Sequence, residues 1–152
     1  MQTSKLFDYI CQHEFIMQYH LRDHTADIAV ESIAPTLEEA FAGIAEGLAS
    51  AHSDDPLSGG AKFNFTISSE SLESLLFDFL ATLIYERDIY DVLPINHTVQ
   101  IEQNKTNWSL SSVYHGVPIS SITSREIKAV TYSDMAIERI PSGWKLYVVF
   151  DV

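Results

Sequence analysis

Cysteine is nearly absent from this sequence of 152 residues, which limits its covalent and metal chemistry. Cys11 is the single cysteine, so the chain cannot form an internal disulfide or a zinc site built on several thiolates. A chain without disulfides is typical of a reducing compartment, which predicts a cytoplasmic location. Residues 1–15 interrupt their apolar positions with Asp8, His13 and Glu14, a pattern unlike that of a signal peptide.

Positive charge is also scarce. Nine Lys and Arg residues face 21 Asp and Glu residues, which gives a formal net charge of −12. Such a chain is repelled by phosphate backbones and by anionic membrane surfaces, so we expect neither nucleic acid nor a membrane as a direct partner. No apolar run approaches the roughly 18 residues of a membrane-spanning helix. A basic protein remains the natural kind of partner.

Sequence motifs of common catalytic sites are missing. The chain has no GxSxG or HExxH motif, no Cys–His pairing, and neither of the glycine-rich phosphate-binding loops GxGxxG and GxxxxGK[ST]. We therefore expect that the protein is not an enzyme.

The hydrophobic pattern predicts a single α+β domain, with two amphipathic helices packed on an antiparallel or mixed β-sheet. One helix begins after Thr36, which forms a capping box with Glu39, and ends before Pro56. The apolar spacing of residues 68–88 predicts the second helix. Strand-like patterns mark 19–31 (with a turn at 25–26), 62–67, 95–101, a segment beginning at Trp108, 125–132, 134–140 and 144–152. Residues 141–143 predict a hairpin turn.

Two other segments carry weaker patterns. Residues 1–18 are interpreted as an N-terminal extension, in which apolar positions from Leu6 to His13 fit a short amphipathic helix. Residues 114–124 are interpreted as a loop. The folded domain is therefore expected to span residues 19–152.

Three anionic groups stand near strand ends. Asp27 directly precedes the apolar residues Ile28, Ala29 and Val30, and Asp151 adjoins the terminal carboxylate of Val152. Carboxylates so placed need a counter-charge, and oxygen donors suit a hard divalent cation such as calcium or magnesium. The residues alone leave a second interpretation open, in which Asp27 caps a turn and Asp151 is solvated.

Lys128 and His24 are candidates for contact with a partner or for activity. Strand alternation places Lys128 in a row with Val130 and Tyr132, where its ammonium either reaches solvent or pairs with Asp27 or Asp151. His24 fits a metal ligand or an acid–base group, and equally an ordinary hydrogen-bonded residue.

Four segments resemble the archease family: "DHTADIAVESIAPTLEEAF" at 23–41, "SLLFDFLATLIYERD" at 74–88, "IKAVTYSDM" at 127–135 and "WKLYVVFDV" at 144–152. The resemblance implies a protein cofactor that promotes guanylylation and turnover of an RtcB-type RNA ligase in tRNA splicing and RNA repair. The family has also been interpreted as a chaperone or modulator of nucleic-acid methyltransferases, which is the alternative function.

The same resemblance implies a bound divalent metal ion, with calcium as the expected ion. Carried onto this sequence, the metal ligands are Asp27 of HTADI and the terminal pair Asp151 and Val152, while Lys128 of KAVTY matches a position important for activity. The sequence departs from the family at Ser133, where a histidine is usual, and at Val117, where a glutamate is usual.

Overall fold

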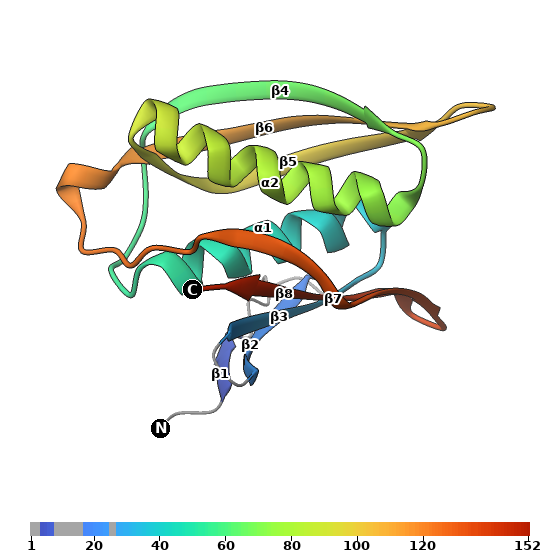
Figure 1. Cartoon of the computed structure of the whole chain (residues 1–152), viewed down its shortest axis with the longest axis horizontal. Helices are drawn as coiled ribbons and strands as arrows, with labels where there is room; N and C mark the ends of the chain where they lie inside the picture. Colours follow the sequence, from blue (N-terminus) through green and yellow to red (C-terminus); the bar gives the residue numbers. More distant parts are fainter. Residues whose placement is uncertain (1–3, 8–16, 25–26) are drawn as a thin grey trace.

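Two antiparallel β-sheets enclose the two α-helices of the described residues (Figure 1). The computed structural model describes residues 4–7, 17–24 and 27–152. One sheet has the strand order β1-β2-β3-β8-β7 and the other β4-β6-β5. The elements are β1 (Ser4–Phe7), β2 (Gln18–His24), β3 (Asp27–Ala34), α1 (Leu37–His52), β4 (Ala61–Ser69), α2 (Leu72–Tyr90), β5 (Val92–Gln103), β6 (Trp108–Pro118), a short 3-10 helix η1 (Ile119–Ser121), β7 (Ala129–Ile140) and β8 (Gly143–Asp151). The α+β prediction is confirmed, with two sheets in place of one.

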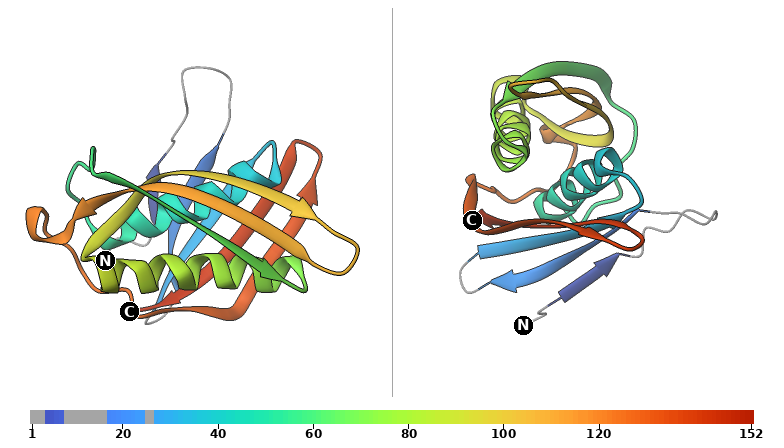
Figure 2. Two further views of the ribbon diagram at one scale, coloured as in Figure 1. Left: turned by 90° about the horizontal axis from the view of Figure 1, so that it is seen from above. Right: turned by 90° about the vertical axis from the view of Figure 1, so that its right-hand side faces the viewer.

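The helices form a layer between the sheets (Figure 2). Helix α1 contacts β2, β3 and β8 on one side and β5 on the other, while α2 contacts β7 and all three strands of the smaller sheet. Fully buried aromatic side chains fill this layer, among them Phe41, Phe79, Tyr114 and Phe150. Burial of such large apolar side chains is the main favourable contribution to folding.

Both helices begin at residues that the sequence marks. The Thr36 side chain accepts a hydrogen bond from the Glu39 backbone at 3.1 Å, which confirms the predicted cap of α1. Ser71 and Ser74 form a reciprocal capping box at the start of α2. Each cap satisfies backbone N–H groups that have no partner within the helix. Within the described part of the chain, no helix has the length and apolar character needed to cross a membrane.

Two local predictions differ from the structure, and a third is confirmed. Residues 4–7 form β1, which pairs with β2, so the helix predicted from Leu6 is wrong there, and its remaining positions up to His13 lie outside the described residues. The segment 19–31 forms two antiparallel strands on either side of residues 25–26, which confirms the strand prediction with its division at these residues. Residues 114–118 continue β6 instead of opening a loop, because they pair with both β4 and β5.

The predicted hairpin turn joins β7 to β8 and places β8 in the sheet. Ile140 pairs with Gly143 across Pro141 and Ser142, and Gly143 has a φ of +140°. A Cβ at this position would collide with the Ala34 carbonyl oxygen. Glycine is therefore required where β8 begins between β3 and β7.

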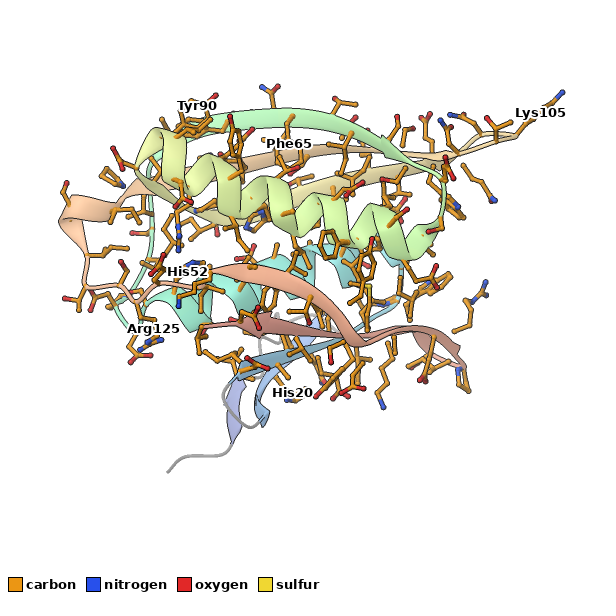
Figure 3. The ribbon with its side chains drawn as sticks, in the orientation of Figure 1. His20, His52, Phe65, Tyr90, Lys105 and Arg125 are labelled. Carbon is orange, nitrogen blue, oxygen red and sulfur yellow. The ribbon has the colours of Figure 1, made fainter. Side chains whose placement is uncertain are left out.

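The segment before β7 is held against the end of α1 (Figure 3). The Arg125 backbone N–H donates to the His52 carbonyl at 2.7 Å, and its guanidinium donates to Asp54 at 2.9 Å. The Ser53 hydroxyl donates to the Thr123 carbonyl at 2.6 Å. These contacts fix where the chain enters β7, beside the end of β8.

A buried histidine lies beneath this segment. The His52 Nδ1 lies 3.0 Å from the Leu48 carbonyl, and its Nε2 lies 2.6 Å from the Arg87 guanidinium. Nδ1–H therefore donates to Leu48, while Nε2 accepts from Arg87. Burial, followed by the positive charge of Arg87, lowers the pKa of His52 from 6.5 to about 4.

Acid is expected to destabilise the fold through His52. In the unfolded chain His52 takes up a proton near its ordinary pKa of 6.5, whereas in the folded chain it stays neutral down to about pH 4. The contribution of His52 to the free energy of unfolding is therefore complete above pH 6.5. It decreases by about 3 kcal/mol as the pH falls toward 4. Urea unfolding measured between pH 4 and 7 checks this slope.

The matched control is His52→Gln, which keeps a donor and an acceptor but does not titrate. The free energy of unfolding of this variant should fall less steeply with decreasing pH, because the contribution of His52 is lost. The contribution of His97, whose pKa is also lowered by burial, should remain. An identical slope in the variant would show that His52 does not act in this way.

Candidate metal site

Asp27 and Asp151 lie directly opposite each other. Asp27 is the first residue of β3 and Asp151 the last of β8, and the two strands pair in antiparallel register with these residues as partners. Side chains of opposed residues point to the same face of a sheet, with Cβ atoms about 5 Å apart. Two residues separated by most of the sequence therefore present their carboxylates to one another.

The start of β7 completes this corner of the sheet. Ala129 pairs with Asp151 from the other side, and the Lys128 backbone N–H donates to the Asp151 carbonyl at 2.8 Å. Asp151 is thus held on both edges, by β3 and by β7. Its backbone is fixed while its side chain is exposed.

The Lys128 side chain does not fill the role of a buried ion-pair partner. Lys128 directly precedes β7 and is exposed, and the described residues include no ion pair between it and Asp27 or Asp151. Its predicted row is not buried throughout, because Val130 is buried while Tyr132 is exposed. The alternative with the ammonium in solvent is the one that the structure supports.

His24 ends β2 and pairs through its backbone with Asp27. Its side chain lies outside the part of the structure that is described, as do Thr25 and Ala26. The backbone register nevertheless places His24 directly opposite Asp27 on β3, with Asp151 one strand further along the sheet, on β8.

The donor set is rich in oxygen and open to solvent. Asp27 is partly exposed, Asp151 is exposed, and Val152, whose carboxylate follows at once, is 45% exposed. Across residues 4–7, 17–24 and 27–152, no three His, Cys, Asp or Glu side chains are grouped to hold a metal ion. In the metal site predicted from the sequence, the Val152 carboxylate would be the third donor beside Asp27 and Asp151. Three carboxylates, with water in the remaining positions, fit a hard divalent cation.

Glu46 is a residue that the sequence did not single out. It lies beside a cavity of about 440 Å³ between α1 and β5, away from the Asp27–Asp151 corner. Its carboxylate accepts the backbone N–H groups of His97 at 2.8 Å and of Asn96 at 3.4 Å. Asn96 has a φ of 56° where the β5–β6 register shifts. Glu46 thus stabilises an irregularity in β5, which no sequence spacing signals.

The two positions that depart from the family pattern have different surroundings. Val117 is buried in β6 and packs with Ala49 and Ile95. Ser133 is exposed, and its backbone N–H donates to the Thr131 hydroxyl at 3.2 Å, where the β7–β8 register shifts. The Val117 side chain therefore serves the core, whereas Ser133 lies on the surface.

Comparison with known proteins covers nearly the whole domain. The model of the Archease protein family matches residues 19–152. The protein archease of Pyrococcus furiosus is 34% identical over 140 residues, which cover 89% of this chain and 99% of that protein. The archease of Methanosarcina mazei is 32% identical over 140 residues, which cover 89% of this chain and 96% of that protein.

Solved structures agree with these sequence matches. The solution structure of a Methanobacterium thermoautotrophicum protein aligns with a TM-score of 0.76 at 27% identity, over 90% of this chain and 98% of that chain. The crystal structure of an archease from Thermotoga maritima, described as a possible chaperone, aligns with a TM-score of 0.56 at 25% identity, over 86% of this chain and 94% of that one. This chain belongs to the archease family.

Proposed function

We propose that this archease is a non-catalytic cofactor of a cytoplasmic RtcB-type RNA ligase, which it activates for guanylylation and turnover in tRNA splicing and RNA repair. In this proposal Asp27, Asp151 and the Val152 carboxylate hold a divalent cation, with calcium as the expected ion. The observation that carries the proposal is the direct pairing of Asp27 with Asp151 in a chain of this family.

The pairing supports a cation because the sheet keeps two like charges together. Opposed carboxylates on neighbouring strands destabilise a sheet unless a positive charge lies between them. Asp27, Asp151 and the Val152 carboxylate would hold a divalent cation, which would supply positive charge at the rim of the sheet.

The overall charge supports a protein partner instead of RNA itself. At a formal net charge of −12 the chain is repelled by phosphate but attracted to the basic surface of an RNA-binding enzyme. Complementary charge of this kind mainly raises the rate of association.

The proposal is tested by guanylylation of the purified ligase from the same organism. Transfer of the guanylyl group to the ligase, and the number of ligations per ligase, should rise several-fold when the protein and calcium are both present. Equal guanylylation with and without the protein would overturn the proposal. A general chaperone or methyltransferase modulator predicts instead an effect on an unrelated client protein that does not depend on metal.

A further inference from the structure

Helix α2 is apolar on its outer face as well as its inner one. Phe77, Ala81, Tyr85 and Ile89 follow one another at intervals of four residues and therefore share one side of the helix. Tyr85 is 62% exposed and Ile89 48% exposed, while Phe77 and Ala81 are half-buried. Large apolar side chains exposed in a row mark a surface for interaction.

The row continues onto β7 and borders a hollow. The Tyr132 ring, 54% exposed, stacks on Phe77 with ring centroids 4.2 Å apart and planes 9° apart. On the opposite side Ala81 and Tyr85 border a shallow hollow of about 380 Å³ between α2 and β4, whose floor includes Ile67. The α2 ridge is defined here as Phe77, Ala81, Tyr85, Ile89 and Tyr132.

The surroundings of the α2 ridge are acidic. Five acidic residues lie on α2 or near Tyr132 on β7, namely Glu73, Asp78, Glu86, Asp88 and Asp134. The single cation of α2, Arg87, is buried and is bonded to His52 and Asp88. An occupant of the ridge therefore needs positive charge around an apolar side chain. A second copy of the chain, at −12, does not meet this requirement.

The α2 ridge lies near the Asp27–Asp151 corner. The last turn of α2 and the carboxyl terminus lie at the same end of the molecule (Figures 1 and 2). Tyr132 follows Ala129, the partner of Asp151, by three residues of β7, a separation of about 10 Å. One partner can therefore contact both places.

We propose that the α2 ridge is a docking surface for a Lys- and Arg-bearing segment of the ligase, with one apolar side chain of that segment in the hollow beside Tyr85. This inference rests on the proposed function, from which it takes the identity of the partner. The exposed rings of Tyr85 and Tyr132 offer faces on which a guanidinium group packs favourably.

Binding of the purified ligase measured by isothermal titration calorimetry tests the α2 ridge. The double variant Tyr85→Ser, Ile89→Ser is expected to bind at least tenfold more weakly than the wild type. The matched control is Tyr90→Ser, because Tyr90 is an exposed α2 residue whose ring lies 5.1 Å from that of Phe63, away from the ridge (Figure 3). It should bind within twofold of the wild type.

A charge variant tests the same surface without removing apolar contacts. Glu73→Lys is expected to weaken binding several-fold at low salt, whereas Glu102→Lys, an identical charge change near the tip of the β5–β6 hairpin, is not. If the wild type and all four variants bind the ligase with the same affinity, the α2 ridge is excluded as the docking surface while the proposed function stands. If the ligase does not bind the wild type, both are overturned.

Discussion

Replacing Asp151 with alanine is expected to reduce ligase stimulation to the level of the ligase alone. Asp151 is the central donor of the proposed site, since Asp27 lies opposite it and Val152 follows it. Losing one of three carboxylates removes up to two oxygen donors and one negative charge, so a cation at this exposed rim should no longer bind. Guanylylation and multiple-turnover ligation measure the effect.

The fold itself should tolerate this substitution. The Asp151 side chain is exposed, and its loss ends the repulsion with Asp27, so without metal the variant should be as stable as the wild type or slightly more so. Glu102→Ala, at an exposed acidic position near the tip of the β5–β6 hairpin, serves as the control and should stimulate the ligase fully. Full stimulation by Asp151→Ala would exclude the site, and a large fall in its melting temperature in EDTA would show a structural role instead.

Replacing Phe79 with alanine is expected to lower the free energy of unfolding by about 3–5 kcal/mol. The ring is fully buried, with its centroid 5.9 Å from that of Phe41 on α1, 6.2 Å from Phe65 on β4 and 6.4 Å from His97 on β5. It therefore joins both helices to the smaller sheet, and its removal leaves a cavity that no single element can close.

Urea unfolding monitored by circular dichroism gives the loss directly. Phe79→Leu keeps most of the buried volume and should lose much less stability than the alanine variant. A loss below about 1 kcal/mol for Phe79→Ala would show that the helices and the smaller sheet do not depend on this contact.

The sequence predicted what local patterns determine. The Thr36 cap, the end of α1 before Pro56 and the turn before Gly143 each depend on neighbouring residues and are confirmed. The division into two sheets depends on pairing between distant strands, such as β3 with β8, which periodicity does not specify. The predicted helix began at Leu6, inside β1, because the four residues of this strand carry too little periodicity to identify it.

The sequence also anticipated that Asp27 meets Asp151, but not how Lys128 contributes. Lys128 reaches this corner through its backbone bond to Asp151, whereas the sequence pattern described only its side chain. The outer face of α2 was missed for a related reason. The sequence predicted the helix itself but no second apolar face, because the four-residue spacing of Phe77, Ala81, Tyr85 and Ile89 stands out only once the inner face is known to be filled.

Calcium titration by isothermal titration calorimetry is the most direct test of the cation at this corner of the sheet. The wild type should bind one calcium ion per chain, Asp27→Asn should bind it at least tenfold more weakly, and Glu102→Gln should match the wild type. Calcium binding that is the same in Asp27→Asn as in the wild type would contradict a site built on the Asp27–Asp151 pair.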